Sequence, residues 1–170
     1  KCGVLAKAEE MFNQLPVRNV VTWNALMMGY LQHGHAEEAL KSFQWMKCEG
    51  LHPNEVTFVI VLKACGSTGA VSKGENVHDE ILLRGFKKDI VLGTALVDMY
   101  IKCGCLSEAQ TVFQNFSSKG VVFWNAQIVG YLKHGLAEGC FKKYTVLAFI
   151  KMLLYLLKIL GNVVIQGQLT

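Results

Sequence analysis

The residues best suited to catalysis in this sequence are a His-Asp-Glu triplet and a pair of cysteines. The triplet, residues 78–80, matches the H-x-E half of the zinc deaminase signature, in which the histidine binds the metal and the glutamate transfers a proton. The second half, P-C-x-x-C, is missing, because one residue rather than two separates Cys103 from Cys105 and no proline precedes them closely. Tetrahedral zinc needs all of its ligands, so we expect no metal site, no cofactor and no enzyme activity.

Composition and charge exclude few classes of function or partner. The 170-residue chain has a formal net charge of +4 and a pI near 8.7, which is compatible with a polyanionic partner without demanding one. Its 6 cysteines show no disulfide-framework spacing, so free thiols in a reducing compartment are expected. The chain opens at Lys1 inside a repeat and without an initiating Met, so we expect a fragment whose targeting segment lies upstream.

A long internal repeat is the strongest feature of the sequence. The stretch VVTWNALMMGYL at residues 20–31 returns as VVFWNAQIVGYL at residues 121–132, and KCGVLAKAEEMF at residues 1–12 returns as KCGCLSEAQTVF at residues 102–113. Self-similarity at a fixed offset indicates stacked units rather than one closed core.

Apolar residues at three- and four-residue spacing divide the chain into helical hairpins. We expect a helix and its exit in residues 1–19, and two helices in each of unit one (20–54), unit two (55–89) and unit three (90–120), followed by a partial unit four (121–147) and a divergent hydrophobic helical tail (148–170). Thr22 is the expected N-cap of unit one. Three glycines are expected in the loop of unit two: Gly66, Gly69 and Gly74.

The hydrophobic stretch near the C-terminus, YTVLAFIKMLLYLLKILGNVVI at residues 144–165, has the length of a membrane span. Lys151 and Lys158 lie inside it, seven residues apart, and therefore share one face of an amphipathic helix. We favour a helix that packs on the end of the stacked hairpins over a membrane span. A non-native extension left by a truncated gene is a third interpretation.

The repeat motifs resemble those of plant pentatricopeptide repeat proteins of the PLS class, in which 35-residue P, long L and short S motifs alternate. The matching runs are V-T-W-N-A-L-x-x-G-Y with E-E-A-L-x-x-F in unit one (P), N-E-V-T-F-x-x-V-L-K-A-C-G with G-x-x-V-H in unit two (L), and T-A-L-V-D-M-Y-x-K-C-G in unit three (S). By this resemblance, residues 1–19 end a truncated S-type repeat and residues 121–147 form a partial P-type repeat. It implies an all-α, right-handed superhelical solenoid of helix–turn–helix repeats.

The resemblance also implies a function, the binding of single-stranded RNA in a mitochondrion or chloroplast with one base per repeat. Members of the PLS class most often select sites for C-to-U editing, with the deaminase supplied by other editing factors, and a membrane is not an expected partner. Two alternatives stay open: a protein-interaction solenoid of the tetratricopeptide kind, and a truncated, non-functional fragment with a membrane-associating tail.

In the family that the chain resembles, the fifth and last residues of a repeat contact the base edge, and the second packs against the base faces. The implied base-reading residues are Asn24, Asn54, Asp89, Thr94, Asn125 and Asn19, and the implied base-packing residues are Val21, Val56, Val91 and Val122. The pair Asn24/Asn54 resembles the pyrimidine-preferring combination, with cytosine ahead of uracil. Val59, the fifth residue of unit two, has no polar atom, and Gly120 departs from the Asp or Asn expected at the end of unit three.

Each of these residues also has a purely structural interpretation. An asparagine early in a helix is commonly a hydrogen-bonding device of the helix N-terminus, although the fixed repeat phase favours base contact here. His78 occupies a place where L motifs commonly carry histidine, which favours a repeat residue over a zinc ligand. Six lysines either neutralise RNA phosphates or form a solvated surface: Lys73, Lys87, Lys88, Lys102, Lys119 and Lys133.

Overall fold

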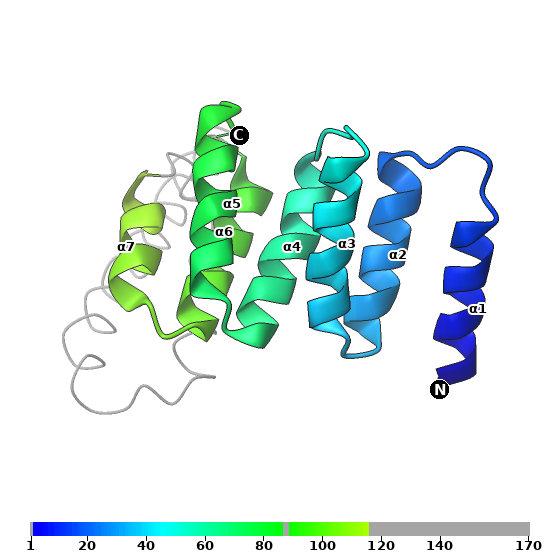
Figure 1. Ribbon diagram of the computed structural model, residues 1–170. Coiled ribbons are helices and arrows are strands. Elements are labelled where there is room, and N and C mark those ends of the chain that lie inside the picture. The colour runs from blue at the N-terminus through cyan, green and yellow to red at the C-terminus, as the bar shows by residue number, and fades with distance from the viewer. Residues whose placement is uncertain (1, 87–88, 116–170) are drawn as a thin grey trace, which may run out of the picture. The chain divides into compact units, whose positions relative to one another are not determined.

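Seven helices follow one another along the part of the chain that the structure describes, residues 2–86 and 89–115 of a computed structural model (Figure 1). They are α1 (Cys2–Asn13), α2 (Val20–Gln32), α3 (Ala36–Cys48), α4 (Glu55–Thr68), α5 (Val71–Leu83), α6 (Ile90–Lys102) and α7 (Leu106–Asn115). No strand occurs between these helices within the two described ranges.

The helices pair into hairpins that stack in sequence order. The first helices α2, α4 and α6 begin at Val20, Glu55 and Ile90, which are 35 residues apart, and each is followed by its partner α3, α5 or α7. Helix α4 packs against α2, α3, α5 and α6, so it joins one hairpin to the next. This arrangement confirms the predicted fold class, an all-α solenoid of helical hairpins.

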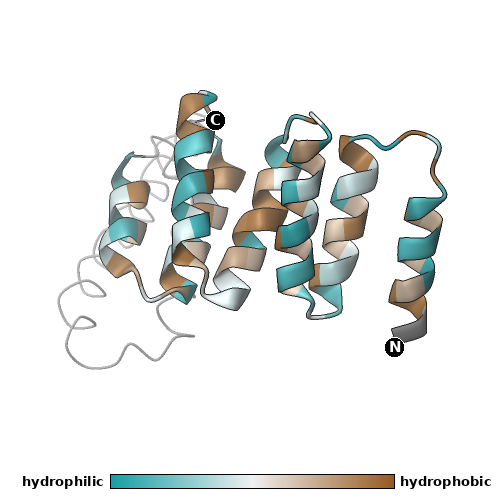
Figure 2. Ribbon diagram, in the orientation of Figure 1, coloured by the Kyte–Doolittle hydropathy of each residue, from teal (hydrophilic) through white to brown (hydrophobic). Residues whose placement is uncertain are grey.

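The helices differ in how much of their surface is buried. Helix α4 buries 7 of its 14 residues, among them Phe58, Ile60 and Leu62, because four helices pack against it, whereas Val56 and Lys63 lie on its exposed side. In Figure 2 the ribbon of α4 is largely brown and that of α2 is brown and white, whereas α3 and α7 alternate between brown and teal. A helix with one polar side is typical of the exposed layer of a solenoid, and a helix that is apolar all round is typical of its interior.

The last residue of each unit caps the first helix of the next one. Asn19 and Asn54 accept hydrogen bonds from the backbone N–H groups of Thr22 and Thr57, and both caps are reciprocal capping boxes. The prediction that Thr22 is the N-cap is therefore wrong: the cap is Asn19, and Thr22 lies three residues later, where its hydroxyl accepts the Asn19 N–H at 3.0 Å. An asparagine amide provides the acceptor that a free helix N-terminus needs, and the threonine satisfies the cap's own N–H.

Glycines with positive φ end the helices at a regular interval. Gly34, Gly69 and Gly104 follow the first helices at φ values of 83°, 68° and 79°. The expectation that Gly66 and Gly74 also lie in the loop of unit two is wrong, because α4 continues through Gly66 and α5 already contains Gly74. Both glycines face α6: a Cβ on Gly74 would lie 2.6 Å from the Met99 side chain, and one on Gly66 would lie 3.0 Å from that of Lys102.

Unit four and the hydrophobic tail lie outside the described residues, and so do Asn125 and Val122. The predicted amphipathic helix over residues 144–165 and the unit boundaries at 121, 147 and 148 therefore stay predictions. Within the described ranges, no helix combines the length and the apolar character needed to cross a membrane.

Gly29 and Gly34 give a matched test of the helix and turn geometry. Gly29 lies inside α2, and a Cβ added to it would meet no atom within 4 Å, so Gly29→Ala should raise the free energy of unfolding by about 0.5 to 1 kcal/mol. Gly34 has φ +83°, so Gly34→Ala should lower it by about 1 to 2 kcal/mol. Urea unfolding followed by circular dichroism measures both, and a change of the same sign for the two variants would contradict the assignment.

Candidate nucleic-acid interface

The two asparagines expected to read one base lie in direct contact. The Asn24 Nδ2 group on α2 donates a hydrogen bond to Asn54 Oδ1 at 3.1 Å, at the end of unit one. Thr57, the third residue of α4, lies beside them, with its Oγ1 2.8 Å from Asn24 Oδ1 and 2.9 Å from Asn54 Oδ1. The structure therefore brings together the fifth and last residues of unit one.

Thr57 is a residue of this cluster that the sequence analysis missed. Its side chain is fully buried, and its hydroxyl oxygen lies within hydrogen-bond distance of both amide oxygens while also accepting the backbone N–H of Asn54 at 3.2 Å. The signal that could have found it is the Asn-x-x-Thr spacing of residues 54–57, which repeats that of residues 19–22 and has the form of a capping box.

The other described residues expected to read bases, Asn19, Asp89 and Thr94, bond to the backbone of the helix that they begin or belong to. Asn19 caps α2, and Asp89 caps α6 by accepting the N–H groups of Val91 and Leu92 at 2.8 and 3.0 Å. The Thr94 hydroxyl donates to the Ile90 carbonyl oxygen of its own helix at 2.7 Å, which is the ordinary back-bond of a helical threonine. The structural interpretation of Asn19, Asn54 and Asp89 as helix caps is thus confirmed. Contact with a base stays a prediction for these three residues and for Thr94.

Three valines form a row of exposed apolar side chains. Val21, Val56 and Val91 are the second residues of α2, α4 and α6, and they are 71%, 54% and 64% exposed. Because α2 packs against α4 and α4 against α6, equivalent positions of these helices lie on the same side of the stack. Exposed β-branched side chains in a regular row provide an apolar platform for flat ring systems, and they are the residues expected to pack against bases.

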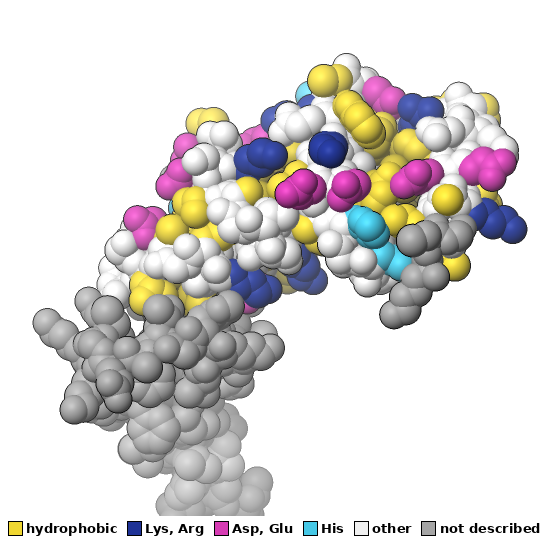
Figure 3. Space-filling model, turned by 60° about the horizontal axis from the view of Figure 1, so that its bottom comes forward, with side chains coloured by type: hydrophobic (Ala, Val, Ile, Leu, Met, Phe, Trp, Pro, Cys, Tyr) yellow, Lys and Arg dark blue, Asp and Glu magenta, His cyan; other side chains and the backbone are white. Residues whose placement is uncertain are grey.

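Charged side chains do not form one basic stripe on the face that Figure 3 shows, where lysines and arginines alternate with carboxylates. Ion pairs account for much of this mixing within the described residues: Arg18–Glu49, Lys47–Glu80, Arg84–Glu80 and Lys102–Asp98. Lys102, one of the six expected phosphate-neutralising lysines, is thus held by Asp98 at 2.6 Å, whereas Lys73 is exposed on α5. The other four lie outside the described residues.

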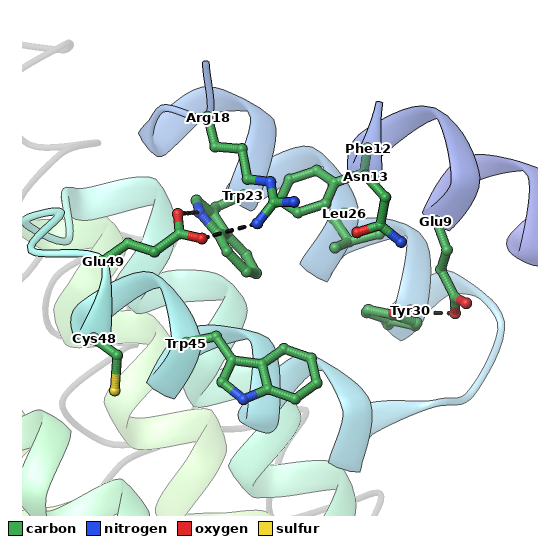
Figure 4. A pocket seen from close by; sticks show the side chains of 10 residues that line it. All are labelled: Glu9, Phe12, Asn13, Arg18, Trp23, Leu26, Tyr30, Trp45, Cys48 and Glu49. Atoms are coloured by element: carbon green, nitrogen blue, oxygen red, sulfur yellow. Dashed lines mark hydrogen bonds and ion pairs between the residues drawn. The ribbon is translucent and has the colours of Figure 1, made fainter. Parts of the chain in front are cut away.

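A pocket of about 550 Å³ lies between α1, α2 and α3 (Figure 4). The polar groups that line it bond one another: the Trp23 indole N–H donates to Glu49 at 3.0 Å, Arg18 pairs with Glu49 at 2.9 Å, and the Tyr30 hydroxyl donates to Glu9 at 3.0 Å. Burial and this bond to Glu9 raise the pKa of Tyr30 to about 12. The Tyr30–Glu9 and Arg18–Glu49 contacts join residues 1–19 to unit one, and we interpret the pocket as a junction between repeats.

His78 packs against a tyrosine of the following repeat. Its Nδ1 lies 3.0 Å from the Tyr100 hydroxyl, and the two rings meet edge to face at 5.7 Å. Burial lowers the pKa of His78, so its neutral form is favoured. No cluster of three or more His, Cys, Asp or Glu side chains within residues 2–86 and 89–115 has a geometry that could hold a metal ion.

Comparison with known families agrees with the repeat geometry. The profile of the PPR repeat family matches residues 18–67, and that of the PPR repeat matches residues 56–86 and 94–121, so together they cover more than half of the chain. The chain belongs to the pentatricopeptide repeat family.

Curated pentatricopeptide repeat proteins of Arabidopsis thaliana are similar to most of the chain. A chloroplastic member is 42% identical over 138 residues, which are 81% of this chain and 17% of the relative. A putative mitochondrial member is 41% identical over 138 residues, which are 81% of this chain and 22% of the relative. The chain therefore spans about a fifth of the length of such relatives, and some of these relatives carry an organellar name.

A solved pentatricopeptide repeat structure has the same fold. The crystal structure of PPR10 in complex with an 18-nt PSAJ RNA element matches with a TM-score of 0.70 at 23% sequence identity, over 89% of this chain and 22% of that one. At 23% identity the similarity supports the helical solenoid fold alone. The roles of individual residues are inferred from their contacts in this chain.

The environment of His78 predicts a pH-dependent stability. Its pKa is lowered in the folded chain, mainly by burial and against the opposing charge of Asp79, so the unfolded chain binds more protons below the usual histidine pKa of 6.5. The free energy of unfolding should therefore fall as the pH drops from about 7.5 to about 5.5.

Thermal melts of the wild type, His78→Gln and His52→Gln across this range measure the effect. His78→Gln should flatten the pH dependence because the glutamine does not titrate. His52→Gln, at an exposed position between α3 and α4, is the matched control and should retain it. A slope that is unchanged by His78→Gln would contradict the assignment.

Proposed function

We propose that this chain binds single-stranded RNA in a sequence-selective manner, with unit one reading a pyrimidine through Asn24 and Asn54. The observation that carries the proposal is the direct contact of these two amides, the fifth and last residues of unit one, on helices whose second residues are exposed valines. A carboxamide can donate and accept hydrogen bonds, as the Watson–Crick edge of a base requires. The valines offer each base an apolar surface, so shape and edge recognition come from different side chains.

The proposed cellular role is that of an RNA adaptor in a plant organelle, the mitochondrion or the chloroplast. The unequal units of 35, 35 and 31 residues support assignment to the PLS class, whose members most often select sites for C-to-U editing, and RNA processing is the other role that fits. In this proposal the chain contributes site recognition, and other editing factors supply the deaminase. The PPR10 complex, in which the same fold holds an RNA element, supports the choice of partner.

Direct binding tests this proposal. Gel-shift titrations of the whole chain with C-rich and A-rich oligonucleotides, repeated over a range of salt concentrations, should show tighter binding to the C-rich RNA. Phosphate contacts lose strength with salt on every sequence, whereas the difference between the two RNAs should persist. An absence of binding above the salt-dependent background would favour a protein-interaction solenoid of the tetratricopeptide kind.

Asn24→Ala should weaken binding most to RNA that has a cytosine opposite unit one. The lost contact is specific for the base edge, so the expected penalty is about 1 to 3 kcal/mol on that RNA and much less on RNA altered at that position. Fluorescence anisotropy with matched oligonucleotides measures the two affinities. Equal weakening on all sequences would contradict base reading by Asn24.

Val56→Ala should weaken binding to a similar extent on every sequence. The substitution removes apolar surface on which any base can lie, and a loss of about 1 kcal/mol is expected from the missing methyl groups. Val4→Ala is the matched control, because Val4 is 67% exposed but lies on α1, outside the row of second residues. An equal effect of the two substitutions, or a base-dependent effect of Val56→Ala, would contradict the proposed role of the row.

A further inference from the structure

We infer that Thr57 is a positioning residue for base recognition: its buried side chain orients the amides of Asn24 and Asn54 so that both turn N–H donors toward a base. The inference rests on the proposed RNA binding by unit one and goes beyond it, because Thr57 belongs to the following repeat and is neither its fifth nor its last residue.

The orientation begins with the cap of α4. The Thr57 backbone N–H donates to Asn54 Oδ1 at 3.0 Å, and a backbone N–H is a donor only. The amide oxygen of Asn54 must therefore face the helix, and its Nδ2 group faces the other way. Asn54 is half-buried, so this NH₂ group can be reached from outside.

The orientation of Asn54 then determines that of Asn24. Asn54 Oδ1 lies 3.1 Å from the Asn24 amide, and two carbonyl oxygens at that distance would repel, so the Asn24 atom there is Nδ2. This leaves Asn24 Oδ1 facing the Thr57 hydroxyl, at 2.8 Å. Asn54 Oδ1 already accepts two N–H groups, which directs the single hydroxyl proton of Thr57 to Asn24.

Both amide oxygens thus accept hydrogen bonds from groups of the protein, so the atoms of these two side chains that remain to bind a ligand are N–H donors. These are the Nδ2 protons of Asn54 and the second Nδ2 proton of Asn24, whose side chain is 7% exposed and so offers only its edge. Cytosine has two adjacent acceptors, N3 and O2, on its Watson–Crick edge, whereas uracil has a donor, N3–H, between its two carbonyl oxygens. A pair of donors therefore favours cytosine.

Removing the Thr57 hydroxyl should weaken this preference. In Thr57→Val the Asn24 carbonyl oxygen loses its internal donor, and a buried acceptor without a partner is unfavourable, so the Asn24 side chain swings away from Asn54 and exposes this oxygen. An outward carbonyl can accept uracil N3–H, which reduces the discrimination between the two pyrimidines.

The neighbouring repeat boundaries provide comparisons within the same chain. Thr22 forms the same capping box with Asn19, with its N–H 3.0 Å from Asn19 Oδ1, but its hydroxyl donates to the Asn19 backbone carbonyl at 2.9 Å. At the boundary of units two and three, the third residue of unit three is Leu92, which has no hydroxyl, and the fifth residue of unit two is Val59. Among the described residues, the threonine bridge to a fifth-position asparagine is found at Asn24 only.

The test compares four forms of the whole chain: wild type, Thr57→Val, Thr57→Ser and Thr22→Val. Thr57→Ser retains the hydroxyl, and Thr22→Val removes an equivalent capping hydroxyl without touching Asn24. The RNA probes are an oligouridine of about eight nucleotides and the same RNA with a single cytosine placed at each position in turn, so that one probe sets the cytosine opposite unit one. The measured quantity is the ratio of the dissociation constants for the uridine probe and the best cytosine probe.

The wild type, Thr57→Ser and Thr22→Val should prefer the cytosine probe by about fivefold or more, the size of effect that one hydrogen bond supplies. Thr57→Val should reduce the preference to about twofold or less. A Thr57→Val chain that keeps the wild-type ratio while losing affinity equally for both probes would overturn the inference and leave the proposed function intact. A wild type that binds neither probe would overturn both.

A measurement on the wild type alone covers the case in which Thr57→Val does not fold. In NMR spectra of the RNA-free chain, a scalar coupling across the hydrogen bond should join the Asn24 Nδ2 nitrogen to the side-chain carbonyl carbon of Asn54. A coupling between the Asn54 Nδ2 nitrogen and the side-chain carbonyl carbon of Asn24 would mean that the two amides have the opposite orientation, and it would overturn the inference.

Discussion

The structure depends on the fact that none of the helical hairpins between residues 20 and 115 can bury its apolar surface alone. Helix α4 shows this most clearly, because it has neighbours from its own hairpin and from both adjacent ones, and residues such as Phe58 and Leu62 are fully enclosed. The burial of apolar surface is the dominant favourable term in folding, so hairpins of this kind gain stability by stacking. Stacking in turn requires each unit to present the same faces to its neighbours, which maintains the 35-residue phase of the first helices.

The same phase places polar groups where adjacent units meet. Each first helix needs acceptors for the free N–H groups of its first turn, and these come from the last residue of the preceding unit: Asn19, Asn54 or Asp89. At the boundary of units one and two, the capping residue also meets Asn24 of α2. A requirement of helix stability and a candidate recognition site therefore use the same amide, and the two interpretations of Asn54 do not exclude each other.

Much of the fold could be predicted from the sequence, because apolar periodicity and the long repeat are carried by many residues at once. Helix ends were less predictable, as they depend on single contacts. Thr22 has the residue type of an N-cap, yet Asn19 takes that role, and Gly66 and Gly74 lie inside helices because close packing on α6 leaves no room for larger side chains there. Helix propensity alone would have placed both glycines in a loop.

The candidate site was predictable in its members but not in its internal bonding. The repeat phase pointed to Asn24 and Asn54 separately, whereas their hydrogen bond and the bridging hydroxyl of Thr57 join residues 30 or more positions apart and depend on how two hairpins pack. A single sequence holds no direct record of such contacts. His78 was recognisable in the sequence through a motif that resembles half of a zinc site. Its contact, a hydrogen bond with the Tyr100 hydroxyl, became evident only in the structure.

The bridging contact at Asn24 bears on how repeats of this kind can be exchanged between proteins. A cassette cut at the start of α4 would carry Asn24 and Asn54 but leave Thr57 behind, and the transplanted module would receive whichever third residue its new neighbour provides. Chimeric arrays are therefore better joined downstream of Thr57, so that all three side chains travel together and the bonds among them are retained.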